Sequence, residues 1–220
     1  FLASIPLVAY FIATFTSNFG NFFNLSEYFY FTNTLYPSIS VFLSLSILFL
    51  ACLSFFFWMF IVPLDLLSKK ISSNSLTKVF YGLFLITPLL LSTMSIFVIN
   101  KYILLTIIMM IWLADIGAYF SGKRFGSIRI AKNISPGKTL EGLLGGFLCN
   151  VIFVLFLYFN GFLNILEGIL LAFLITSLSF YGDIYESFLK RMAKIKDSSN
   201  LIPGHGGFLD RLDSFCPTIP

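Results

Sequence analysis

Long apolar runs separated by short polar segments dominate the chain. Six runs are long enough, or nearly so, to cross a bilayer as helices, because about 20 residues rising roughly 1.5 Å each span about 30 Å of hydrocarbon. A transmembrane β-barrel is disfavoured, since its strands are shorter and alternate apolar with polar positions. The pattern therefore predicts an all-α, polytopic transmembrane helical bundle of about six spans. The expected spans are Phe1–Thr16, Ser38–Leu64, Val79–Ile99, Tyr102–Phe120, Leu140–Phe159 and Phe162–Tyr181.

The composition supports this membrane interpretation and excludes an ordinary soluble domain. Hydrophobic residues make up 58% of the 220 residues and charged residues only 11%, whereas a typical globular chain is about 25% charged. A soluble fold of this size could not cover so much apolar surface with polar side chains. The net charge of +4 is small, and we expect no nucleic-acid partner.

The positive charges predict the orientation of the spans. With six spans in strict alternation, three polar segments lie on one side of the membrane, and they hold all of the 14 Lys and Arg residues except Lys101. Cytoplasmic loops are enriched in Lys and Arg, and basic loops also suit the anionic inner leaflet. We therefore expect these segments and the N-terminus to be cytoplasmic, in a multi-pass protein of the inner membrane.

The acidic residues divide the chain into two regions. Residues 1–100 are expected to be transmembrane helices without a catalytic motif, and residues 101–220 a transmembrane catalytic region with its site at the cytoplasmic face. The N-terminal part, through about Tyr81, shows no polar constellation, and Asp65 is expected in the first cytoplasmic loop. The acidic residues in or beside the later cytoplasmic segments are Asp115, Glu141, Asp183, Glu186, Asp197, Asp210 and Asp213.

Asp115 lies near the expected cytoplasmic end of a span. A carboxylate at that depth costs roughly 2.5–3.5 kcal/mol on insertion scales, so such groups usually face a partner or a water-filled cavity. This predicts a functional role for Asp115. The alternative is an interfacial carboxylate that reaches lipid headgroups or pairs with Lys123.

The segment Ser135–Gly142 opens the next span. It is not a P-loop, because Lys132 stands where the first glycine would be and no buried strand precedes it. We expect Ser135 to cap the helix and Pro136 to occupy its first turn. Lys138 and Glu141 would then share one helical face, near backbone N–H groups that favour anions. A plain helix cap with a surface ion pair is the alternative.

The densest polar segment begins at Asp183. If helical, Asp183, Glu186, Ser187 and Lys190 lie on one face. Glycines follow, and Asp210 and Asp213 return at helical spacing. Carboxylate oxygens suit Mg²⁺ and the cationic side chains suit phosphates, a combination appropriate to a nucleoside triphosphate. His205, the single histidine, has a structural and a catalytic interpretation, and zinc is disfavoured because no other soft ligand is near.

The segment Ser187–Asp213 resembles the signature of the phosphatidate cytidylyltransferase family, also called CDP-diacylglycerol synthases. The matching positions include Lys190-Arg191, Lys196-Asp197, Pro203-x-His205-Gly206-Gly207 and Asp210-Arg211-Leu-Asp213. The segments around Asp115 and from Ser135 are similar to two further blocks of that family. For residues 1–100 only the hydropathy matches.

The resemblance implies a reaction and a set of site residues. Phosphatidate and CTP would give CDP-diacylglycerol and pyrophosphate, with Mg²⁺ as cofactor and room for two metal ions. The family's paired aspartates correspond to Asp183 and Asp210, and Asp115 and Glu141 would be further metal ligands or organisers of the site. Lys190, Arg191, Lys196 and Arg211 would hold the triphosphate or the lipid phosphate. The remaining catalytic candidates are Asp197, His205 and Asp213, and the substrate-binding candidates are Lys138, Ser187, Gly206, Gly207 and Lys123.

Several alternatives stay open. A related membrane cytidylyltransferase that acts on another lipid phosphate shares the same motifs. A transporter, from a different class, would place polar groups near mid-membrane, whereas here they gather at the cytoplasmic ends. The motif of the CDP-alcohol phosphatidyltransferases is absent from the sequence. Monomer and homodimer are both compatible with the sequence, and we expect both termini to be trimmed relative to a complete family member.

Overall fold

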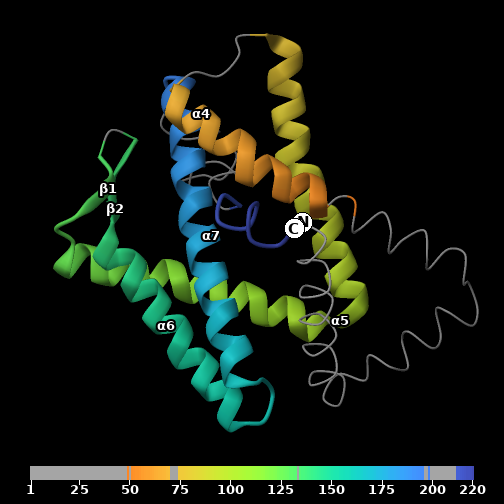
Figure 1. Ribbon diagram of the computed structural model, residues 1–220, viewed down its shortest axis with the longest axis vertical. Coiled ribbons are helices and arrows are strands. Elements are labelled where there is room, and N and C mark those ends of the chain that lie inside the picture. The colour runs from red at the N-terminus through yellow and green to blue at the C-terminus, as the bar shows by residue number, and fades with distance from the viewer. Residues whose placement is uncertain (1–48, 50, 70–73, 133, 196–197, 199–211) are drawn as a thin grey trace, which may run out of the picture.

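The computed structural model describes residues 49, 51–69, 74–132, 134–195, 198 and 212–220 (Figure 1). These residues include five helices that are long and apolar enough to cross a membrane. An all-α polytopic membrane bundle is therefore confirmed, whereas the expected span Phe1–Thr16 lies outside the described residues. The orientation of the N-terminus and the total of about six spans stay predictions. The five helices are Ala51–Ser68, Ser75–Phe97, Asn100–Phe125, Leu140–Phe159 and Ile165–Met192.

The first of these helices is irregular, and the next two are joined. Residues Phe57–Ile61 form a π-helical turn, η1, that continues into helix α4, Val62–Ser68. Helix α5 runs over Ser75–Phe125 with a sharp break at Asn100, whose backbone is extended at φ −162° and ψ 108°. The two halves of α5 consequently point in different directions (Figure 1).

Asn100 makes the break in α5 tolerable in an apolar setting. Its side-chain oxygen accepts hydrogen bonds from the backbone N–H groups of Tyr102, at 2.8 Å, and Ile103, at 3.4 Å. These are amides that a helix start leaves without a partner, and Asn100 itself is only 6% exposed. The predicted boundary between the spans Val79–Ile99 and Tyr102–Phe120 is therefore confirmed, and Asn100 caps the second span.

Helix α6, Leu140–Phe159, packs closely against α5, and helix α7, Ile165–Met192, follows it. A Cβ atom added at Gly146 of α6 would lie 2.6 Å from the carbonyl oxygen of Ala114 in α5, so only glycine allows this approach of the two backbones. Small residues of this kind let membrane helices gain packing energy that lipid cannot match. Between α6 and α7, the fully buried Asn150 donates a hydrogen bond to Thr176 at 2.9 Å.

A β-hairpin precedes α6, where we expected the helix to begin. Strand β1, Arg129–Ala131, pairs antiparallel with strand β2, Ser135–Thr139. The predicted cap at Ser135 and first turn at Pro136 are therefore wrong. Thr139 is the N-cap instead, because its hydroxyl accepts a hydrogen bond from the Gly142 N–H at 3.1 Å. Threonine is also among the preferred N-cap residues, and a cap at Thr139 leaves the preceding residues free to pair as a strand.

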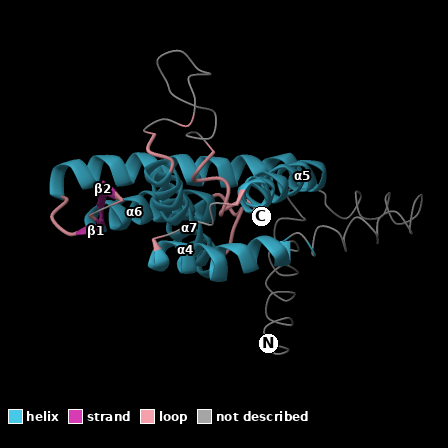
Figure 2. Ribbon diagram, turned by 90° about the horizontal axis from the view of Figure 1, so that it is seen from above, coloured by secondary structure: helices cyan, strands magenta, loops and turns pink. Residues whose placement is uncertain are grey.

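The C-terminal turn, residues 212–220, lies against α7 near the middle of the bundle (Figures 1 and 2). A Cβ atom added at Gly182 would lie only 2.3 Å from the carbonyl oxygen of Asp213 and 2.7 Å from the Pro217 ring. Ser214, Cys216 and Ile219 are buried in the contact. The glycine therefore lets the turn bring its polar side chains next to those of α7.

Candidate active site

Two carboxylates from different helices meet at one serine hydroxyl. Ser214 Oγ lies 2.6 Å from Asp183 Oδ1 on α7 and 3.2 Å from Asp115 Oδ2 on α5. The hydroxyl has one proton to donate, so the two aspartates share it. Ser179 of α7 donates a second hydrogen bond to Asp115 Oδ1 at 3.0 Å. The predicted functional carboxylates Asp115 and Asp183 are thus brought together.

Lys138 adds a positive charge to this cluster. Its ammonium group forms an ion pair with Asp183, and the two side chains are only 25% and 13% exposed. The ammonium also lies 5.2 Å from the ring centre of Phe180, within the range of a cation–π contact. Burial lowers the pKa of Lys138, while the nearby Asp115, Asp213 and Glu186 act in the opposite direction. A phosphate reaching this site would meet a partly desolvated lysine.

Further charged side chains continue along α7. The helix extends to Met192, so the predicted helical face that holds Asp183, Glu186 and Lys190 is confirmed. Glu186 is 5% exposed and pairs with Lys190 at 2.5 Å. Ser187 lies half-buried on the same helix, and Arg191 is exposed beside its end. α7 therefore carries acidic and basic groups in a continuous row out of the apolar span.

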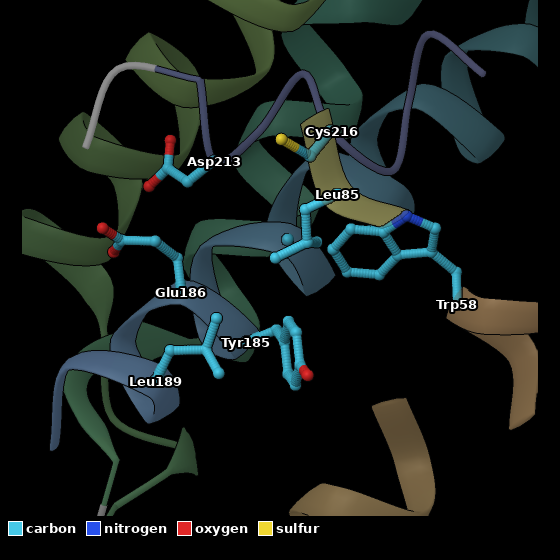
Figure 3. A pocket seen from close by; sticks show the side chains of 8 residues that line it. Trp58, Leu85, Tyr185, Glu186, Leu189, Asp213 and Cys216 are labelled. Atoms are coloured by element: carbon cyan, nitrogen blue, oxygen red, sulfur yellow. The ribbon is translucent and has the colours of Figure 1, made fainter. Parts of the chain in front are cut away.

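A small pocket adjoins this row (Figure 3). Glu186 and Asp213 lie on one side of it and Trp58 on the other, while the hydroxyl of Tyr185 is turned away from the two carboxylates. Cys216 also lines the pocket. Burial, followed by the charges of Asp213 and Glu186, raises the pKa of the Cys216 thiol to about 12. The thiol therefore stays protonated near neutral pH and is a poor nucleophile.

Glu141 is held elsewhere. Its carboxylate accepts a hydrogen bond from the Ser127 hydroxyl and lies 3.1 and 3.2 Å from the Ile128 N–H, in the loop before β1. Lys138 and Glu141 were expected to share a helical face, which is wrong because Lys138 belongs to β2. The alternative ion pair between Asp115 and Lys123 is not formed in the described part of the structure, where the Lys123 ammonium lies 5.7 Å from the centre of the Tyr119 ring.

The N-terminal region contributes a polar group that the sequence analysis missed. Asp65 belongs to α4, is 8% exposed, and accepts hydrogen bonds from the hydroxyls of Tyr81 and Tyr185 at 3.1 and 3.0 Å. We expected Asp65 to lie in a loop, which is wrong because it belongs to a helix. We also expected no cluster of polar residues in the chain through about Tyr81, which is wrong because Asp65 and Tyr81 are hydrogen-bonded. The sequence did contain a signal for Asp65, because a carboxylate within an apolar run by default indicates a functional residue. Ser179 and Ser214 gave no such signal.

Seven predicted site residues lie outside the described residues, and their roles stay predictions. Of the two aspartates expected to bind the metal ion, Asp183 and Asp210, the structure therefore describes only Asp183. The seven are Lys196, Asp197, His205, Gly206, Gly207, Asp210 and Arg211.

The donor atoms of the cluster fit Mg²⁺. Asp115, Asp183 and Ser214 offer hard oxygen atoms, and Mg²⁺ in enzymes is typically held by one or two carboxylates together with substrate phosphates and water. Within the described ranges, no group of three or more His, Cys, Asp or Glu side chains forms a complete metal site.

The fold and the cluster define a class of protein: a polytopic membrane protein in which acidic and basic side chains from α5, α7 and the hairpin before α6 meet. Comparison with known proteins makes the class specific. The model of the cytidylyltransferase family matches residues 4–220, so the chain belongs to that family. The family resemblance of the signature is thereby confirmed.

Several relatives are named phosphatidate cytidylyltransferase, and three of them illustrate the similarity. The protein of Haemophilus influenzae is 42% identical over 125 residues, 54% of this chain and 43% of its own length. That of Pseudomonas aeruginosa is 46% identical over 121 residues, 54% and 45% of the two chains. That of Aquifex aeolicus is 38% identical over 152 residues, 69% and 58% of the two chains. The chain thus spans about half the length of these relatives.

Proposed function

We propose that the protein is a phosphatidate cytidylyltransferase, which transfers a cytidylyl group from CTP to phosphatidate and releases pyrophosphate. The observation that carries the proposal is the convergence of Asp115, Asp183 and Lys138 from three separate elements. The convergence occurs in a chain of the cytidylyltransferase family. The names of the relatives supply the substrate, since each is called a phosphatidate cytidylyltransferase.

The chemistry explains why such a cluster is useful. A phosphate oxygen of phosphatidate attacks the α-phosphorus of CTP, and the bond from that phosphorus to the oxygen bridging to the β-phosphorus breaks. Such transfers depend on in-line positioning and charge neutralisation more than on a strong base. Lys138 would exchange its ion pair with Asp183 for a pair with a phosphate oxygen. Lys190 and Arg191, near the end of α7, supply further positive charge to the leaving pyrophosphate.

We propose Mg²⁺ as the cofactor, held by Asp183 and Asp115, with Asp210 as the expected partner from the signature. The ion, when bound, would neutralise charge on the phosphates. The Ser214 hydroxyl between the two carboxylates supports a site at this position, because it brings their oxygens to one point. Glu141 is no longer proposed as a ligand, because its carboxylate is engaged with Ser127 and Ile128.

The cytoplasmic face of the inner membrane is the proposed location of the site. Asp115, Lys138 and Asp183 lie toward the helix ends that adjoin basic residues such as Arg124 and Arg191, and basic residues favour the cytoplasmic side. CTP is water-soluble and phosphatidate is confined to the leaflet. A site at the interface can receive both.

The test is the incorporation of label from CTP into lipid. The protein is reconstituted in vesicles with and without phosphatidate, and α-³²P-labelled CTP and Mg²⁺ are supplied. We expect chloroform-soluble label and an equal amount of pyrophosphate only when phosphatidate is present. Label transferred equally well to another lipid phosphate would indicate a related cytidylyltransferase. Ion flux without CTP turnover would overturn the proposal in favour of a transporter.

A further inference from the structure

Asp65 joins three helices through two hydrogen bonds. Its Oδ1 accepts from Tyr81 of α5 and its Oδ2 from Tyr185 of α7, while Asp65 itself belongs to α4. The two tyrosines use different oxygens, so both bonds coexist. Hydrogen bonds to a carboxylate are among the strong ones, and a buried carboxylate that loses its partners is costly. The arrangement of the three helices at this point is therefore well determined.

Tyr185 is held as firmly by its ring as by its hydroxyl. The side chain is 1% exposed, and its ring centre lies 5.6 Å from that of Trp58 and 6.1 Å from that of Phe188. A buried side chain packed against two aromatic rings has little room to move relative to its backbone. A constraint on the Tyr185 hydroxyl is therefore a constraint on α7.

The same turn of α7 carries the carboxylates of the candidate active site. Asp183 and Glu186 flank Tyr185 closely in the sequence, yet the hydroxyl of Tyr185 is turned away from Glu186 and Asp213 (Figure 3). Asp65 thus holds one side of the helix while the opposite side faces Lys138 and Ser214.

We infer that Asp65 is a positioning residue for the proposed reaction: by binding Tyr185 it sets the rotation of α7 about its axis. That rotation decides where Asp183 lies relative to Lys138 and Ser214. The inference rests on the proposed function. Among the described residues, the Asp65 carboxylate accepts its hydrogen bonds from Tyr81 and Tyr185, so its effect on turnover passes through α7.

The kinetic test uses Asp65→Asn, which keeps the size of the side chain and removes its charge, and Tyr185→Phe, which keeps the ring. Each is expected to lower kcat by about 10- to 100-fold, because small misplacements in an active site have effects of this size. The KM for CTP should change by less than about threefold, since the lost alignment matters mainly in the transition state. The double variant should be little worse than either single one, because both break the same contact.

The matched control is Tyr158→Phe, which removes a hydroxyl from an exposed tyrosine near the end of α6 remote from the site. It should leave kcat unchanged. A purely stabilising contact would lower the melting temperature of Asp65→Asn and Tyr185→Phe but leave kcat per folded molecule normal. That result would overturn the inference. If Asp65→Asn does not insert, Tyr185→Phe carries the test by the same criteria.

A second readout does not depend on turnover. Cys216 is 3% exposed and lines the pocket beside Tyr185, whereas Cys52 is exposed. Alkylation of each thiol by a maleimide is followed by mass spectrometry below the melting temperature. If wild-type protein shows no cytidylyl transfer, the proposed function fails, and the thiol readout then tests only the structural half of the inference, that the Asp65–Tyr185 contact sets the position of α7. A faster reaction at Cys216 relative to Cys52 in Tyr185→Phe would support control of α7, and an unchanged ratio would overturn it.

Discussion

Lys138 of β2 forms an ion pair with Asp183 of α7 across 45 residues of sequence. The β-hairpin makes this pairing possible, because an extended segment before α6 carries Lys138 back to α7 instead of aligning it with Glu141. The ion pair places a cationic side chain and a carboxylate where a nucleotide phosphate and its metal ion would both be needed.

Removing the charge of Asp183 should abolish catalysis without unfolding the protein. Asp183→Asn keeps the shape of the side chain but loses the acceptor charge for Lys138 and Mg²⁺. We expect CDP-diacylglycerol formation to fall by about 100-fold or more, as for other losses of electrostatic stabilisation. Glu167→Gln, at the opposite end of α7, is the control. Near-normal turnover by Asp183→Asn in correctly inserted protein would refute its assignment.

Displacing the C-terminal turn should impair the site from a distance. In Gly182→Ala the new methyl group would meet the carbonyl oxygen of Asp213, which is backbone and cannot turn aside. Ser214 would then move away from Asp115 and Asp183, and we expect a loss of roughly 10-fold in kcat. Gly82→Ala in α5 is the matched control, because nothing lies within 4 Å of its added Cβ and alanine favours helix. Equal activities of the two variants would contradict the importance of this contact.

The shared hydroxyl of Ser214 should matter more than an ordinary helix hydroxyl. Ser214→Ala leaves Asp115 with the hydrogen bond from Ser179 and removes the bridge to Asp183. We expect about a 10-fold loss of activity, in line with the loss of groups that orient metal ligands. In Ser95→Ala, where the lost bond is to the carbonyl of Leu91, activity should be unchanged. A Ser214→Ala enzyme as active as the Ser95→Ala enzyme would show that the bridge is dispensable.

Glu141 should behave as a support of the loop rather than as a metal ligand. Glu141→Gln retains an oxygen that can accept from Ser127 or Ile128. The Mg²⁺ concentration for half-maximal activity should therefore stay within about twofold of the wild-type value. A metal ligand should behave differently, because loss of even a group that supports a ligand typically costs about 10-fold or more in metal affinity. Titration of activity with Mg²⁺ after chelation distinguishes the two. A large increase would restore Glu141 to the metal site.

Some features of the site were predictable from neighbouring residues. The row Asp183, Glu186 and Lys190 follows from helical spacing alone, since residues three and four apart share a face. The break at Asn100 follows from a polar pair between two apolar runs. The start of α6 was less predictable, because Ser135 and Thr139 are both good N-caps and the choice between them depends on whether β1 is there to pair with β2.

The apolar runs by themselves determined that this is a membrane protein of spanning helices, because hydrocarbon thickness imposes a minimum length and leaves no backbone polar group without a partner. The signature residues determined the family. Only the tertiary structure decided that Lys138 pairs with Asp183, that Ser214 joins Asp183 to Asp115, and that Asp65 binds Tyr185. These contacts join residues far apart in the sequence, and they depend on how closely the helices and the terminal turn approach, which no local pattern encodes.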